Sequence, residues 1–137
     1  MKKIFLALTL GVVLYTTNLN AQSNINWILK EKTDAVFFSK TIFDYSLSGF
    51  STQSEVTAFY NKMRENLDVS SVKDNGKDAK GNYNVSVNMK SVKDESYYLN
   101  WAIKLGVAYI INFKGEKKTP QQILTAKNNN VAKPSKH

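Results

Sequence analysis

The chain has 137 residues, with 19 lysine or arginine side chains against 11 aspartate or glutamate side chains and a formal net charge of +8. It has no cysteine, which excludes disulfides, thiolate metal sites and cysteine nucleophiles. The one histidine is His137, far along the chain from every predicted strand and helix, so no serine–histidine pair is expected in the folded domain.

The excess of positive charge lies near the C-terminus. Residues 22–113 carry 11 basic and 10 acidic side chains, whereas residues 114–137 carry six lysines and a single acid, Glu116. A folded nucleic-acid-binding domain concentrates lysine and arginine on a face of the domain itself. The sequence therefore predicts no nucleic-acid partner, and it leaves open a weak contact of the basic tail with anionic surfaces such as phospholipid or polysaccharide.

Residues 1–21 have the order of a secretory signal peptide. Two lysines precede the apolar run Ile4–Tyr15, and polar residues then lead to a cleavage point after Ala21. The apolar run has 12 residues, whereas a membrane-spanning helix needs about 20. We therefore expect an exported protein, periplasmic or extracellular, with no transmembrane anchor after cleavage and with one domain in the rest of the chain.

Residues 22–38 show no single clear period. Ile25, Trp27 and Leu29 precede a polar stretch, which is followed by the apolar run Ala35–Phe38. The pattern fits an extra strand or a short helix that covers one sheet edge, and Trp27 is expected to pack in the core. This segment is an N-terminal extension whose structure the pattern leaves open.

The first clear strand and helix follow. Over Thr41–Leu47 apolar residues alternate with polar ones, which predicts a half-buried strand that ends before Gly49. Apolar residues then recur at the three-and-four spacing of an amphipathic helix that ends near Asn66. These residues are Val56, Phe59, Tyr60 and Met63.

A hairpin is predicted next. Leu67–Val72 is a strand candidate, and Asn82–Lys90 alternates between apolar residues and asparagine or serine. The charged connection between them contains Asn75-Gly76, a dipeptide typical of hairpin turns. Because polar residues occupy every second position of Asn82–Lys90, one face of the sheet is expected to meet water.

A second helix and a last strand complete the domain. Asp94 is a good N-cap, Gly106 ends the helix, and Tyr109–Phe113 forms the final strand. The order strand, helix, strand, strand, helix, strand is that of the ferredoxin-like α+β fold. Residues 39–113 are thus expected to form a four-stranded antiparallel sheet with both helices on one face.

The chain after Phe113 has few large apolar residues. Pro120, three consecutive asparagines and the segment Lys133–His137 give it a basic and polar composition. Residues 114–137 are therefore expected to form a disordered tail.

The junction of the first strand and the first helix reads Gly49-Phe50-x-Thr52-x-x-Glu55. In its size, its element order and this run, the domain resembles the heavy-metal-associated domain, a small copper- and zinc-trafficking module. That family carries Gly-Met-x-Cys-x-x-Cys at this junction, where two thiolates hold a soft ion. Gly49 matches the family's glycine, Phe50 replaces the methionine, and Thr52 and Glu55 stand at the cysteine positions. The resemblance thus implies the family's fold without its thiolate site, and no cofactor is expected.

Thr52 and Glu55 also have the spacing of a helix capping box. The Thr52 hydroxyl can accept from the Glu55 backbone N–H, while the Glu55 carboxylate can accept from the Thr52 backbone N–H. Hydroxyl and carboxylate oxygens are hard donors, poorly suited to Cu(I) and too few to hold zinc alone. The spacing therefore favours a structural cap over a metal site.

The acidic residues show no catalytic pairing. They are spread over predicted strands, turns and caps, at Asp44, Asp68, Asp74, Asp78, Asp94 and Glu95. The preferred hypothesis is an exported, non-catalytic module with a protein partner in the cell envelope. The alternative is a metal-handling protein that uses oxygen ligands or the ligands of its partner.

Overall fold

The computed structural model describes residues 24–30 and 40–131. The predicted signal peptide lies outside these residues, as do part of the N-terminal extension and residues 132–137 of the tail. The described part of the chain has a mixed α+β architecture with a six-stranded sheet and three helices. None of these helices combines the length and the apolar character needed to cross a membrane.

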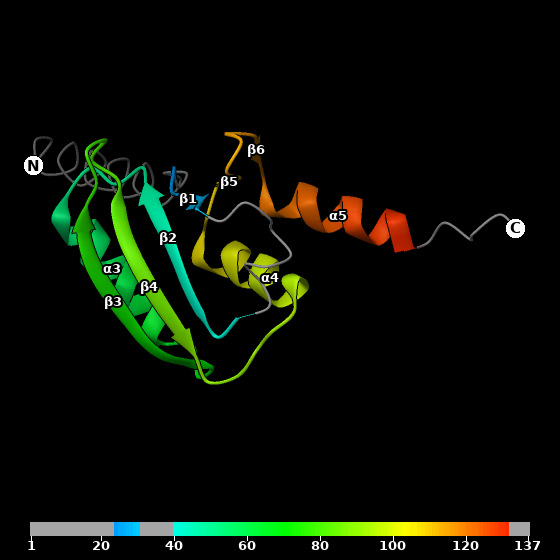
Figure 1. The fold of residues 1–137 in the computed structure, drawn as a ribbon, viewed down its shortest axis with the longest axis horizontal. Helices are drawn as coiled ribbons and strands as arrows, with labels where there is room; N and C mark the ends of the chain where they lie inside the picture. Colours follow the sequence, from blue (N-terminus) through cyan, green and yellow to red (C-terminus); the bar gives the residue numbers. More distant parts are fainter. Residues whose placement is uncertain (1–23, 31–39, 132–137) are drawn as a thin grey trace, which may run out of the picture.

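The elements follow one another along the chain as shown in Figure 1. The strands are β1 (Asn26–Leu29), β2 (Ile42–Ser48), β3 (Val69–Lys77), β4 (Tyr83–Met89), β5 (Tyr109–Ile111) and β6 (Lys117–Lys118). The helices are α3 (Gln53–Arg64), α4 (Glu95–Leu105) and α5 (Pro120–Val131). Helices α3 and α4 lie against the sheet, and α5 extends from the end of the sheet that carries β6 (Figure 1).

The sheet has the strand order β3-β4-β2-β1-β5-β6. All neighbouring strands are antiparallel except β1 and β5, which run parallel. The predicted sheet of four antiparallel strands is thus too small, and it lacks the parallel pair. The two additional strands come from the segments on either side of the predicted domain.

Strand β1 lies inside the sheet, between β2 and β5, and not at an edge as the sequence pattern suggested. Its registers place Trp27 beside Leu47 of β2 and beside Ile110 of β5. Trp27 and Leu29 are buried, as expected for Trp27, whereas the alternate residues face the other side of the sheet. Four residues give too short an alternation to reveal a central strand from the sequence.

One core lies between the sheet and the helices, and on β2 and β4 its residues are among those that the alternation predicted. They are Phe43, Tyr45, Leu47, Val85, Val87 and Met89. On β5 the buried residue is Ile110, whereas Tyr109 and Phe113 are exposed, so the apolar residues predicted for the last strand are not its core residues. On α3 and α4 the core residues are Val56, Phe59, Tyr60, Met63, Tyr98, Leu99, Trp101, Ala102 and Leu105. The two helices therefore cover the same face of the sheet.

Polar side chains occupy the opposite face of the sheet, as the alternation predicts, and they pair across it. Ser46 Oγ donates to Asn84 Oδ1 at 2.9 Å, and Ser86 Oγ donates to Asp44 Oδ1. These contacts join β2 to β4 in addition to the backbone pairing of the two strands. The acidic group of Asp44 is thus part of a cross-strand pair.

The β3–β4 hairpin turns later than the Asn75-Gly76 dipeptide suggested. Strand β3 continues to Lys77, and the pairing shifts register between Asp74 and Lys77, so the dipeptide lies in an irregular part of the ladder. The turn spans residues 78–82, and Asp78 Oδ1 accepts from the backbone N–H groups of Lys80 and Asn82, each at 2.9 Å. Aspartate is frequent in such turns because its side-chain oxygens accept hydrogen bonds from nearby backbone N–H groups, as a backbone carbonyl would.

The chain after Phe113 is ordered through residue 131, unlike the disordered tail expected from its composition. Strand β6 pairs with β5, and Ile123 and Leu124 of α5 pack against the core. Thr119 begins α5 with a reciprocal cap, because its Oγ1 accepts from Gln122 N at 3.1 Å and its N donates to Gln122 Oε1 at 2.9 Å. These two partly buried apolar residues and this cap stabilise α5, which the composition of the segment did not indicate.

Candidate functional site

A hollow of about 540 Å³ lies between α3 and α4, and a second of about 500 Å³ lies between α3, the loop at Gly49 and the end of α4. Lys62 and Leu105 line both of them, so the two hollows adjoin each other, and we call the pair the interhelical groove. Its principal lining residues are Phe50, Ala58, Lys62, Leu67, Trp101, Lys104 and Leu105. Space is available there because α3 presents the small side chain of Ala58 and α4 ends at Gly106.

The floor of the groove is apolar and fixed. Phe59, Trp101 and Leu105 belong to the buried core while they line the groove. The Trp101 ring meets the ring of Trp27 edge to face, with centroids 5.9 Å apart, so α4 is packed directly on the central strand β1. A ligand in the groove would therefore meet a pre-formed apolar surface.

Gly49 and Phe50 form one end of the groove. They are the first two residues of the run that resembles the metal-binding loop of the heavy-metal-associated domain. Gly49 has a φ of +95°, and a Cβ there would lie 2.0 Å from the backbone oxygen of Asn24. Phe50 packs edge to face on Phe59 and Tyr83, with centroids at 5.5 and 5.9 Å. Gly49 thus permits the segment before β1 to lie close to its backbone, and Phe50 packs over the edge of the core.

Thr52 and Glu55 form the capping box of α3. Thr52 Oγ1 accepts from Glu55 N at 3.2 Å, and Glu55 Oε2 accepts from Thr52 N at 3.3 Å. The same Glu55 oxygen accepts from Ser51 N at 2.7 Å. The two residues at the family's cysteine positions therefore hold the start of a helix.

A polar cluster lies at the other end of the groove. Tyr97 OH donates to Asp68 Oδ2 at 2.6 Å and contacts the Asn66 amide, while Lys93 Nζ lies 3.4 Å from Asp68 Oδ1. The hydrogen bond from Tyr97 and the charge of Lys93 lower the pKa of Asp68. Partial burial and the bond to Asp68 raise the pKa of Tyr97. The cluster ties the turn after α3 to the first turn of α4.

The predicted acidic residues are not brought together. Asp44 pairs with Ser86, Asp78 forms a turn, and Asp94 Oδ1 caps α4 by accepting from Tyr97 N at 2.8 Å. Asp74 accepts from a backbone N–H in β3. Within residues 24–30 and 40–131 no three histidine, aspartate or glutamate side chains are placed to hold a metal ion.

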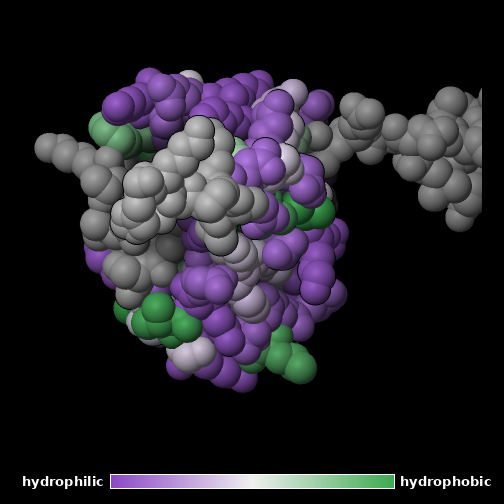
Figure 2. Space-filling view, turned by 90° about the vertical axis from the view of Figure 1, so that its right-hand side faces the viewer, coloured by the Kyte–Doolittle hydropathy of each residue, from purple (hydrophilic) through white to green (hydrophobic). Residues whose placement is uncertain are grey.

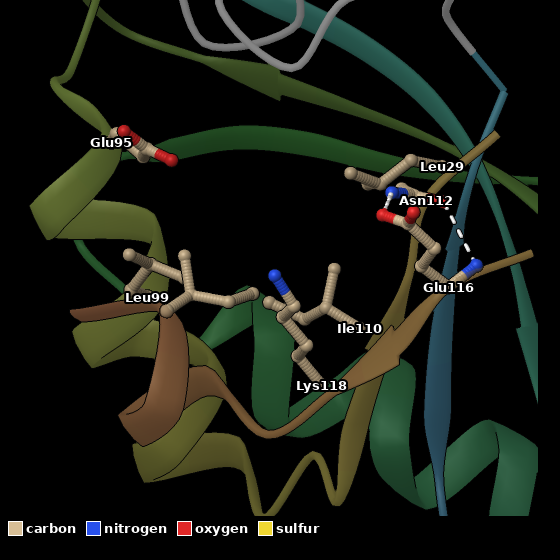
Figure 3. Close-up of a pocket in the computed structure, with 8 residues that line it drawn as sticks. Leu29, Glu95, Leu99, Ile110, Asn112, Glu116 and Lys118 are labelled. Carbon is tan, nitrogen blue, oxygen red and sulfur yellow. Dashed lines mark hydrogen bonds between the residues drawn. The ribbon is translucent and has the colours of Figure 1, made fainter. Parts of the chain in front are cut away.

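A smaller pocket of about 150 Å³ lies beside α5 (Figure 3). Glu95 and Glu116 lie on opposite sides of it, and the side chain of Lys118 extends from β6 between them (Figure 3). Lys127 Nζ pairs with Glu95 Oε2 at 2.9 Å, and Asn112 Nδ2 donates to Glu116 Oε2 at 2.7 Å. Both carboxylates therefore have partners within the chain.

Sequence patterns did not mark the walls of the groove. No motif includes Lys62 or Lys104, and Leu67 was predicted to begin a strand, whereas it precedes β3 and its side chain is 86% exposed at the groove. A large apolar residue directly after the predicted end of a helix is the one local signal that could have marked this end.

Comparison with known proteins found no protein-family model, no curated protein and no solved structure that matches the chain. The chemistry of the groove therefore has to be judged from its own residues.

Proposed function

We propose that this protein is an exported, non-catalytic module that binds a protein of the cell envelope through the interhelical groove. The groove itself carries the proposal, because it combines a buried apolar floor with an exposed leucine and charged walls. Protein recognition sites have this composition of apolar centre and polar rim. Export is supported by the order of residues 1–21, as in a signal peptide.

The face of the molecule drawn in Figure 2 favours a narrow site. The face drawn in Figure 2 is mostly hydrophilic, and its hydrophobic residues form small separate patches. A broad apolar surface of the kind that obligate partners bury is not seen on that face. A groove that takes a single segment of a partner suits such a surface better.

The fold proposal is that a ferredoxin-like unit underlies the larger sheet. β2, α3, β3, β4, α4 and β5 follow the order βαββαβ, which supports this proposal. β1 would then be a strand added between β2 and β5. Similarity to the heavy-metal-associated domain is part of the same proposal, and it is supported by the position of the Gly49 loop between β2 and α3.

Photo-crosslinking from the groove tests the proposed function. Benzoylphenylalanine is introduced at Ala58 of the full-length protein in the cells that make it, and the matched control carries the same group at Ala126, an exposed alanine of α5. We expect a discrete protein adduct after illumination from position 58 and none from position 126. Adducts of equal yield from both positions, or none from position 58, would contradict binding through the groove.

A further inference from the structure

The dipeptide Asn75-Gly76 does not form the hairpin turn that its sequence predicts. It lies near the end of β3, between the ladder pairs of Asp74 and Lys77, where the pairing with β4 shifts register. Both residues are exposed, and no atom lies within 4 Å of the Cβ position of Gly76. No other asparagine of the chain precedes a glycine. The pair therefore has the space and the access to water that a reaction of the asparagine side chain requires.

Asparagine followed by glycine is prone to cyclise, because glycine has no Cβ to obstruct the ring or to shield its backbone nitrogen. From the position of this pair we propose that Asn75 is a site of spontaneous deamidation. The Gly76 nitrogen loses its proton and bonds to Cγ of Asn75, while the Cγ–Nδ2 bond breaks and ammonia leaves. Water then opens the resulting succinimide to aspartate or isoaspartate. One water is consumed and one ammonia released, with no change of oxidation state.

Two hydrogen bonds hold the reacting groups, and both lie at the surface. Gly76 N donates to Asp74 Oδ1 at 2.8 Å, and Asn75 Nδ2 donates to Ser86 Oγ at 2.6 Å. Neither is part of the backbone ladder between β3 and β4, so water can replace each of them without separating the strands. The ring can therefore close after a local rearrangement while the sheet stays formed.

Asn84 of β4 shows the contrast on the same face of the sheet. It pairs with Ser46 inside the ladder, and its Oδ1 accepts from Ser46 Oγ at 2.9 Å and from Lys30 Nζ at 2.7 Å. The next residue is Val85, whose branched side chain crowds the nitrogen that would attack. Asn84 is thus an internal control for the reaction of Asn75.

The product cannot keep the contact of the original side chain. Asn75 Nδ2 is a donor, whereas a carboxylate only accepts, and the one hydroxyl proton of Ser86 is already donated to Asp44. A carboxylate at position 75 would therefore face Ser86 without a donor and would be repelled by Asp44. Isoaspartate also lengthens the main chain by one methylene. We expect the modification to loosen the end of the β3–β4 hairpin.

Peptide mapping by mass spectrometry tests the reaction. The full-length protein and a synthetic peptide of residues 71–79 are incubated side by side in mildly alkaline buffer. We expect Asn75 to gain about 1 Da in the protein, at a rate within about tenfold of that in the peptide, with isoaspartate detected by enzymatic methylation. Asn84 should stay intact in the same digest. Asn75→Gln should stay unmodified at position 75, because glutamine has to close a larger ring.

An Asn75 that remains intact after the peptide has reacted, or a mass gain at Asn84 in its place, would overturn the proposal. Aspartate without isoaspartate would also overturn it, because opening of a succinimide yields both. Amide hydrogen exchange of modified and fresh protein tests the consequence. Exchange should become faster in residues 73–77 and stay unchanged in α3. Equal exchange of residues 73–77 in the two samples would contradict the loosening of the hairpin.

Discussion

Gly49 holds a backbone position in which both conformation and space favour glycine. Its φ of +95° is strained for other residues, and a Cβ would lie 2.0 Å from Asn24 O on the segment that leads into β1. Gly81 has a similar φ of +83° with no atom within 4 Å of its Cβ position. The two glycines therefore separate the effect of conformation from the effect of contact.

We predict that Gly49→Ala destabilises the protein by about 3 kcal/mol or more, whereas Gly81→Ala costs about 1–2 kcal/mol from the left-handed conformation alone. Urea unfolding followed by tryptophan fluorescence measures both. Equal losses for the two variants would show that β1 does not lie against Gly49.

Thr52→Ala should lower the free energy of unfolding by about 1 kcal/mol, because the helix loses the acceptor for Glu55 N. Ser54→Ala is the matched control, since Ser54 is an exposed serine in the same first turn. That change should stay within about 0.5 kcal/mol. Denaturant titration of the two variants distinguishes a cap from a solvated threonine.

Residues with local roles could be predicted, and residues with tertiary roles could not. Thr52 and Glu55 interact across three positions, so their spacing was enough to predict the capping box, which is present. Lys62 and Lys104 come from different helices, and only the folded chain brings them to one groove. The same difference explains why the sequence indicated the loop at Gly49 but not the site beside it.

At the scale of elements, strong periodicity was predictive and short segments were not. The strands around Tyr45 and Val87 and the helix that begins after Asp94 lie where alternation and capping placed them. Strand β1 has four residues and pairs with β5, more than 80 positions away, so no local pattern could place it. Helix α5 did have a signal, because Thr119-Pro120 followed by Gln122 combines an N-cap, a first-turn proline and a capping partner.

Helix α5 gives a prediction at this scale. Ile123 packs against the core, whereas Thr125 is an exposed β-branched residue of the same helix. Ile123→Asp should detach α5 and lower stability by about 1–3 kcal/mol, and Thr125→Asp should change it little. Amide hydrogen exchange would show loss of protection through α5 in the first variant. Slow exchange of these amides in Ile123→Asp would mean that α5 does not depend on this contact.

The molecule as a whole depends on an aromatic core with buried hydroxyl groups. Trp27, Phe43, Tyr45 and Tyr98 are among its most buried side chains, and the Phe43 and Tyr98 rings meet edge to face at 4.5 Å. Burial raises the pKa of Tyr45 and of Tyr98. Such a core favours the neutral form of each phenol. The stability of the fold should therefore have an upper pH limit.

Tyr60 allows that limit to be tested. Burial, with Asp74 and Tyr83 nearby, raises its pKa from 10.0 to about 12. The unfolded chain ionises this phenol near pH 10, so the contribution to stability is complete below pH 10 and is lost as the pH rises toward 12. Within the described residues its buried hydroxyl has no hydrogen-bond partner, so Tyr60→Phe should leave stability at pH 7 unchanged or slightly higher.

The expected result for Tyr60→Phe is a shallower loss of stability between pH 10 and about 12, measured by urea unfolding at several pH values. Tyr109→Phe is the control, because Tyr109 is an exposed tyrosine of β5 and its removal should leave the slope unchanged. If both variants lose stability with pH as the unaltered protein does, the alkaline limit does not arise from Tyr60. A decrease in stability at pH 7 in Tyr60→Phe would instead show that its hydroxyl is bonded, because a phenol that lacks a partner contributes nothing that phenylalanine cannot supply.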